Sequence, residues 1–352
     1  MLQLIILVLV LQVLMNSENK KAVALLNLGN GLLCSAVLLN NAASDKTPYL
    51  LTANHCLTAS DPTLWSVRFN WTSPNPQCGT GLESTNRANN YTLSGASLRA
   101  NNAASDFALV ELNQPIPQNW DVAFAGWDRS DVIPEYTVGI HHPKGDIMKV
   151  CQDLDAPAHD VANNTEVWLI KGASAGSGNG WEIGTTEEGS SGSPLFNNEG
   201  KLIGQLYGGT SNCEGTSTNG EFDVYGRFAV SWEYGSTAQT RLKEWLDPFN
   251  TQAVEVETLQ NTLTVPDFEN ALAFSVYPNP AQDFVTVYNT QFSQLQYTLY
   301  NVQGQAIQKG ALRATENRVS LESLPQGIYL IHFLDTETQE QSTHKIVHVN
   351  RL

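Results

Sequence analysis

Three short stretches of the chain carry side chains that together can cleave an acyl bond. His55 lies in the stretch TANHC, Asp106 stands directly before the apolar run FALVEL, and Ser191 lies in GSSGSP. A serine hydroxyl is a weak nucleophile until a base accepts its proton, and a third group must fix the tautomer of that base. The residue types therefore predict nucleophilic catalysis, with Ser191 as the nucleophile, His55 as the general base and Asp106 as the orienting carboxylate.

The order of the three residues along the chain distinguishes between the known types of triad. Base, carboxylate and nucleophile follow one another as in chymotrypsin-type enzymes, whereas subtilisin-type enzymes and α/β-hydrolases use other orders. Glycines on both sides of Ser191 allow backbone N–H groups to converge, so the amides of Gly189 and Ser191 are the predicted oxyanion hole. The sequence thus predicts a serine endopeptidase of the chymotrypsin type.

Composition and charge indicate a secreted protein that does not bind nucleic acid. Only 15% of the residues are charged, the formal net charge is −16 and the pI is about 4.7, so the surface repels nucleic acid and anionic membranes. No cysteine pair has CxxC spacing, and no cluster of residues indicates a metal or another cofactor. Cys34 and Cys56 bracket a strand-loop-strand segment, so we expect a disulfide there and an oxidising compartment.

The first part of the chain has the pattern of an all-β domain. Short apolar runs alternate with turns rich in Gly, Asn and Pro over residues 22–248, which predicts a barrel or sandwich. Residues 227–232 are expected to form one of its strands. Residues 237–246 predict a C-terminal helix, which Asp247 and Pro248 would end.

The remaining segments predict a leader, a linker and a second domain. Residues 1–21 are either an apolar export leader or a misassigned N-terminus. Residues 249–271 are rich in Thr, Glu and Asn and predict a linker. Residues 272–352 return to the β pattern and predict a small β-sandwich, with an NVQG hairpin turn at residues 301–304.

Several stretches of the first domain resemble the lysyl endopeptidase family of secreted serine proteases. They are, in order, SAVLLNN, YLLTANHC, ASDFALVEL, GTTEEGSSGSPLF, IGQLYGG and DVYGR. The resemblance implies a chymotrypsin-like double β-barrel with the triad between the barrels, and cleavage after lysine through an acyl-enzyme. It assigns the triad roles to His55, Asp106 and Ser191.

The resemblance also implies residues that bind the substrate lysine. The family's lysine-selecting carboxylate corresponds to Asp223, and such a carboxylate could pair with a long cationic side chain; the alternative is an ordinary loop aspartate. Tyr207 stands where the family has an imidazole, beside Gly208. Trp168 is the candidate for the family's indole, with core packing as its alternative.

The C-terminal domain resembles a type IX secretion sorting domain. Its YPNP entry, NVQG hairpin, LPQGIYLI strand and closing HKIVHV carry the resemblance. It implies export through the periplasm to the surface or surroundings of a Gram-negative bacterium, with the secretion machinery as a partner. A generic carbohydrate- or protein-binding β-sandwich is the alternative.

Two other functions remain open for the chain as a whole. One is a non-catalytic surface adhesin on a protease scaffold, and the other is a protease of the same fold with a different preference at the residue before the cleaved bond. We expect a monomer that acts on proteins or peptides with exposed lysine.

Overall fold

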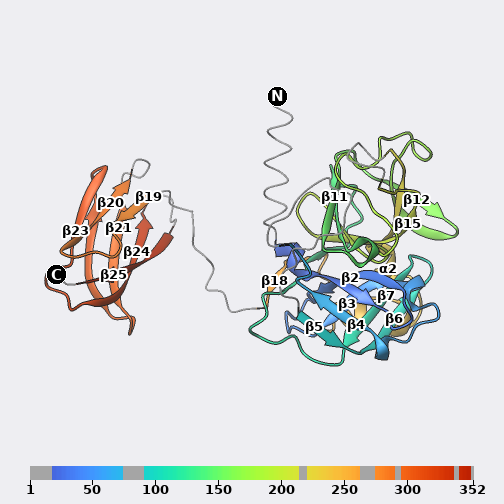
Figure 1. Cartoon of the computed structure of the whole chain (residues 1–352), viewed down its shortest axis with the longest axis horizontal. Coiled ribbons are helices and arrows are strands. Elements are labelled where there is room, and N and C mark those ends of the chain that lie inside the picture. The colour runs from blue at the N-terminus through green and yellow to red at the C-terminus, as the bar shows by residue number, and fades with distance from the viewer. Residues whose placement is uncertain are drawn as a thin grey trace. The chain divides into compact units, whose positions relative to one another are not determined.

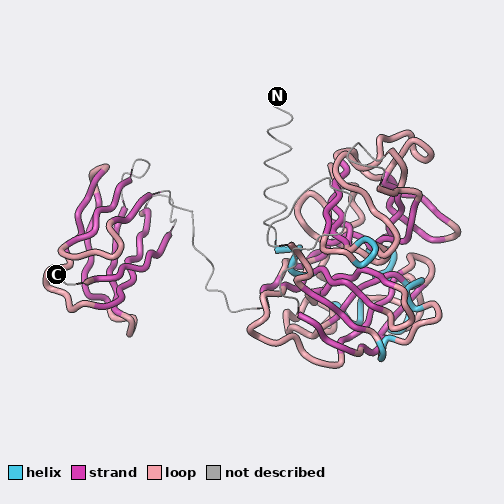
Figure 2. Tube along the Cα trace, in the orientation of Figure 1, coloured by secondary structure: helices cyan, strands magenta, loops and turns pink. Residues whose placement is uncertain are grey.

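The chain folds into two compact units, Met1–Leu263 and Thr264–Leu352. The computed structural model describes residues 18–73, 91–213, 220–261, 274–289, 295–336 and 341–349. Strands dominate both units, and the helices are few and short (Figure 2). Within those residues, no helix combines the length and the apolar composition that crossing a bilayer requires.

The first unit begins with a seven-stranded antiparallel sheet (Figure 1). Its strand order is β5-β4-β1-β2-β3-β7-β6. Alternate residues of one strand enter different cores, as the two-residue period of a strand requires: Ala36 and Leu38 pack in one, Val37 and Leu39 in the other. The sheet is therefore buried on both faces. The strands are β1 (Val23–Asn27), β2 (Leu33–Leu39), β3 (Tyr49–Ala53), β4 (Ser66–Phe69), β5 (Tyr91–Ser94), β6 (Ala96–Asn102) and β7 (Phe107–Leu112).

The second sheet of this unit has nine strands. Its main path is β11-β10-β14-β15-β16-β13-β12, and β9 and β17 join it at β15. The two curled sheets confirm the predicted chymotrypsin-like double β-barrel. The strands are β9 (Trp127–Asp128), β10 (Thr137–His141), β11 (Lys149–Asp153), β12 (Ala158–Ala162), β13 (Thr165–Ile170), β14 (Pro194–Phe196), β15 (Leu202–Gly209), β16 (Asp223–Arg227) and β17 (Glu255–Val256).

Two sequence predictions of secondary structure need correction. The strand expected over residues 227–232 is the α-helix α2 (Phe228–Glu233), which buries Phe228 and Trp232, four residues apart, on one face. The helix expected over residues 237–246 is broken at Arg241, whose backbone is extended. A 3₁₀ turn, η5 (Ala238–Thr240), and a short helix, α3 (Lys243–Leu246), stand in its place.

The predicted linker partly belongs to the first unit. Within residues 249–271, β17 pairs with β9, and β18 (Leu259–Gln260) pairs with β8 (Ala123–Phe124). The chain therefore stays bound to the first unit as far as Gln260. The remaining 3₁₀ turns are η1 (Glu18–Ala22), η2 (Asn54–Leu57), η3 (Pro62–Leu64) and η4 (Pro143–Gly145).

The end of the predicted leader also packs on this unit. Residues 1–17 lie outside the described residues, but η1 follows them directly. The Asn19 amide donates to the carbonyl of Gly200 at 2.6 Å, and the Lys21 ammonium lies 2.9 Å from the Asp121 carboxylate. Residues 18–21 are thus part of the folded unit.

The second unit consists of a three-stranded and a four-stranded antiparallel sheet (Figure 1). Residues of both sheets, such as Val287 and Ile331, share one core, so the unit is a sandwich. Gly304, at φ +77°, ends the NVQG turn between β21 and β22. The strands are β19 (Phe274–Tyr277), β20 (Phe284–Asn289), β21 (Leu295–Asn301), β22 (Ala306–Leu312), β23 (Glu316–Ser320), β24 (Gly327–Asp335) and β25 (Gln341–His348).

Candidate active site

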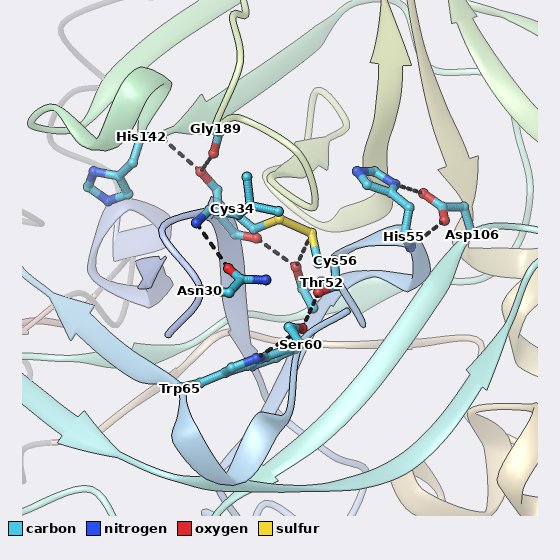
Figure 3. The surroundings of a disulfide bond; sticks show 12 residues. Asn30, Cys34, Thr52, His55, Cys56, Ser60, Trp65, Asp106, His142 and Gly189 are labelled. Atoms are coloured by element: carbon cyan, nitrogen blue, oxygen red, sulfur yellow. Dashed lines mark hydrogen bonds and ion pairs between the residues drawn. A yellow bond between two sulfur atoms is a disulfide. The ribbon is translucent and has the colours of Figure 1, made fainter. Parts of the chain in front are cut away.

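His55 and Asp106 form a hydrogen-bonded pair in the first barrel (Figure 3). His55 lies in η2, directly after β3, and Asp106 stands one residue before β7, the neighbour of β3. The imidazole Nδ1 lies 2.8 Å from Asp106 Oδ2, and the backbone N–H of His55 donates to Oδ1 at 3.0 Å. Both carboxylate oxygens therefore hold the histidine, which leaves its Nε2 as the atom that can accept a proton.

The carboxylate of Asp106 is buried and firmly held. Its residue is only 3% exposed, and burial raises the pKa of Asp106, while the hydrogen bond from His55 opposes that rise. The preceding carbonyl, of Ser105, accepts a hydrogen bond of 2.7 Å from the Gln205 side chain on β15. A strand of the second barrel is thus bonded to the residue that precedes Asp106. The attraction between a carboxylate and a neighbouring imidazolium is strongest where burial keeps water away from the carboxylate.

The predicted disulfide between Cys34 and Cys56 is confirmed (Figure 3). It ties β2 to the residue that follows His55, so the turn carrying the base is covalently anchored. Cys151 is buried and takes part in no disulfide, and Cys78 lies outside the described residues.

Ser35, next to that disulfide, binds the loop that carries Ser191. Its backbone N–H donates to the carbonyl of Ser191 at 2.7 Å, and its hydroxyl donates to the carbonyl of Gly189 at 3.1 Å. The same hydroxyl accepts the N–H of His142 at 3.0 Å. Consecutive residues of β2 therefore connect the histidine turn and the serine loop.

A close backbone contact brings the serine loop to the end of β3. Gly192 has a φ of +78°, and a side chain there would collide with the hydroxyl of Thr52 and the backbone of Ala53. Only glycine allows this approach, which sets Ser191 beside the strand that leads into His55. Among the described residues no hydrogen bond joins the Ser191 hydroxyl to the imidazole.

The backbone N–H groups of the loop divide into two sets. Those of Ser190, Gly192 and Ser193 donate to carbonyls of the protein at 2.8 to 3.0 Å. Within the described part of the chain, those of Gly189 and Ser191 donate to no protein group. Gly189 has a φ of +87°, which turns its peptide relative to its neighbours. The two N–H groups predicted to form an oxyanion hole are thus the two that remain available.

Ser190, the residue before the candidate nucleophile, is held by a buried histidine. Its hydroxyl lies 2.7 Å from Nδ1 of His141, which is fully buried. Burial lowers the pKa of His141 to about 3, so this imidazole is neutral. A hydrogen bond between two uncharged groups therefore supports the loop.

Asp223 lies buried at the start of β16, at 1% exposure. Its Oδ2 accepts hydrogen bonds of 2.7 Å from the Trp181 indole and from the Thr186 hydroxyl. Burial raises the pKa of Asp223 to about 7, although these two hydrogen bonds lower it. Burial therefore leaves the charged form of this carboxyl group poorly solvated.

Tyr207 and Gly208 lie on β15, the strand paired with β16. The ring centroids of Tyr207 and His55 are 6.1 Å apart, so Tyr207 lies next to the His55–Asp106 pair. No atom lies within 4 Å of the position that a Cβ at Gly208 would take, so the space above this backbone is open. The residues predicted around the substrate thus lie between the base and Asp223.

Trp168 does not occupy the place expected of the indole. It is 1% exposed and donates to the carbonyl of Ile203 at 3.0 Å. Trp168 pairs with Tyr225, which lies two residues along β16 from Asp223. Its side chain therefore packs in the core. The indole that contacts the carboxylate is that of Trp181.

Sequence reasoning missed three residues of this region: Trp181, Thr186 and Ser35. Thr186 lies within the quoted stretch GTTEEGSSGSPLF, so its closeness to Ser191 was a signal that could have found it. Trp181 and Ser35 carry no such local signal, because their contacts are with residues distant in the chain.

Two family descriptions match parts of the chain. The description "Lysyl endopeptidase, C-terminal domain" matches residues 12–226, and "Secretion system C-terminal sorting domain" matches residues 275–350. A solved structure titled "Crystal structure of Deg5" is similar at 12% identity, over 60% of this chain and 87% of that one, with a TM-score of 0.36. Since the first match covers more than half of the residues, the chain belongs to the lysyl endopeptidase family, as a secreted serine protease with a type IX sorting domain of Gram-negative bacteria.

Proposed function

We propose that this protease is a monomeric endopeptidase that cleaves proteins on the carboxyl side of lysine, through an acyl-enzyme on Ser191. The observation that carries the catalytic part is the His55–Asp106 pair beside a loop with two uncommitted N–H groups. The observation that carries the specificity is the buried carboxylate of Asp223.

The chemistry follows from these groups. As Ser191 Oγ attacks the carbonyl carbon, His55 Nε2 accepts its proton, and Asp106 stabilises the imidazolium that forms. The N–H groups of Gly189 and Ser191 bind the developing oxyanion. The imidazolium then protonates the leaving amine, and a water molecule, activated by the same imidazole, hydrolyses the ester at Ser191.

Specificity for a cation follows from the charge of Asp223. Burial removes water from this carboxylate and so destabilises its charge. An ammonium group beside the carboxylate stabilises that charge, and this interaction favours binding of a cationic side chain. A glutamate side chain would be repelled. The direct test is to digest a protein mixture with the full chain and to map the cut sites by mass spectrometry. Cuts confined to lysine support the proposal; cuts after arginine or glutamate indicate the same fold with another specificity, and no cuts indicate an adhesin.

Substitution of the carboxylate is expected to remove the preference for lysine. Asp223→Asn keeps an oxygen that can accept from Trp181 and Thr186 but loses the charge. Loss of one partner of a buried charge pair costs about 2–5 kcal/mol, so kcat/KM for a lysyl ester should fall about 30-fold to 4,000-fold. The matched control is a leucyl ester, whose hydrolysis should change less than about threefold. An unchanged Lys/Leu ratio would point to another residue as the selector.

The preference for lysine should depend on pH. Because the pKa of Asp223 is raised to about 7, its charge is present above that pH and is lost as the pH falls through it. The ratio of kcat/KM for lysyl and leucyl esters should therefore fall about tenfold between about pH 8 and pH 6. Any effect of pH on the chemical step itself acts on both substrates and cancels in the ratio. A ratio that stays constant over this range would contradict the assignment.

A further inference from the structure

Three carboxylates gather where β11 ends. Asp153 is the last residue of β11, Asp155 lies two residues further on, and Glu182 comes from the segment before the serine loop. One oxygen of each lies within 4.8 Å of the other two. Asp153 is only 1% exposed, and its Oδ2 has no hydrogen-bond partner. A buried oxygen of this kind is costly unless something binds it.

The protein itself holds the cluster in place without neutralising it. The N–H of Asp155 donates to Asp153 Oδ1 at 2.9 Å, and the N–H of Leu154 donates to Glu182 Oε2 at 2.7 Å. The backbones of Gln152 and Ile183 are joined by two hydrogen bonds, of 2.9 and 3.2 Å. Among the ion pairs of the described residues, none involves these three carboxylates. Three acidic side chains are thus gathered without an ion pair, although the positive charge of Lys171 acts on Asp153.

We propose that Asp153, Asp155 and Glu182 bind one calcium ion. The donors are all carboxylate oxygens, which suit a hard cation, whereas zinc prefers nitrogen and sulfur ligands. Ca²⁺–oxygen distances are about 2.3–2.6 Å, so oxygens up to 4.8 Å apart can share one ion. Exposed Asp155 leaves room for the water molecules that complete six to eight ligands. The ligands come from two segments far apart in the chain.

The site adjoins the region assigned to lysine binding. Glu182 directly follows Trp181, whose indole donates to Asp223 Oδ2. A cation that ties Glu182 to the end of β11 would hold this indole in place. This consequence rests on the proposed function of Asp223, but calcium binding itself does not, so binding is measured separately from activity.

The test is the effect of calcium on thermal unfolding of the full chain with Ser191→Ala, which prevents self-digestion. Tryptophan fluorescence is a clean readout, because every tryptophan of the sequence lies in the first unit. With about 10 mM CaCl₂ in place of EDTA, we expect the Tm to rise by about 5 °C, as for a site filled well above its Kd. Calorimetric titration should give one Ca²⁺ per chain.

Single substitutions identify the ligands. In the same background, Asp155→Asn and Glu182→Gln should each reduce the rise in Tm to below about 1 °C. Asp155 is exposed, so its substitution does not threaten folding. Glu199→Gln, which removes an exposed charge elsewhere, is the matched control and should keep the full effect.

Three results would overturn the proposal. They are no rise in the Tm of the parent protein, an equal rise in both ligand variants, and an equal rise with MgCl₂ at the same ionic strength. A rise that depends on Asp155 and Glu182 supports calcium binding even if Asp223 proves not to select lysine. In that event only the link to specificity fails.

Discussion

Ser191→Ala is expected to lower kcat for a lysyl ester or amide by about 10⁶-fold while leaving the fold intact. The substitution removes the only atom assigned to the covalent bond, so the acyl-enzyme cannot form. The backbone hydrogen bond from Ser35 to the carbonyl of residue 191 does not depend on the side chain and should persist. Steady-state kinetics with an active-site titrant give the loss, and thermal unfolding checks the fold.

The matched control is Ser193→Ala, the same change in the same loop. Ser193 is buried, whereas Ser191 is partly exposed, and Ser193 has no role in the proposed chemistry, so kcat should stay within about tenfold of the wild type. If Ser191→Ala retained a large part of the activity, another nucleophile would be at work and the proposed mechanism would be wrong.

Asp106→Asn is expected to lower kcat by about 10⁴-fold. The asparagine amide can donate to Nδ1 of His55, which would leave the proton on Nε2, where it cannot accept one from the serine. The hydrogen bond from the backbone of His55 to Oδ1 can still form, so folding should change little. The pH–rate profile of Asp106→Asn distinguishes a wrong tautomer from misfolding. If the tautomer is wrong, a higher pH should partly restore the rate.

Asp131→Asn provides the contrast for this prediction. Asp131 forms an ion pair with Arg227 in the second barrel and has no place in the proposed chemistry. Its substitution should lower the free energy of unfolding while kcat stays within about threefold. Equal losses of kcat in the Asp106 and Asp131 variants would mean that the Asp106 result reflects structure alone.

The base and its carboxylate could be predicted from the sequence because each stands at the end of a strand with a clear pattern. TANHC begins with the last two residues of β3 and FALVEL forms β7, and these two strands pair, so the fold brings His55 to Asp106. Cys34 and Cys56 could also be paired from the sequence. A single loop separates β2, which carries Cys34, from β3, which ends three residues before Cys56.

Residues whose roles depend on distant partners could not be predicted. Trp181 and Trp168 are both buried tryptophans, and only the pairing of β13 with β16 decides which of them meets Asp223. Phe228 and Trp232 lie in an apolar run that suits a strand or a helix equally well. The strands at 255–260 are polar and two residues long, so only their partners in the first unit identify them.

The most direct test of the central claim is covalent trapping with a lysyl diphenyl phosphonate. A serine nucleophile attacks its phosphorus, forms an Oγ–P bond and expels phenoxide, so the enzyme keeps a mass label. Peptide mapping is predicted to place one label per chain on Ser191, formed much more slowly in Asp106→Asn and with a leucyl phosphonate. A label on another residue, or none on a preparation that still cleaves proteins, would contradict the account.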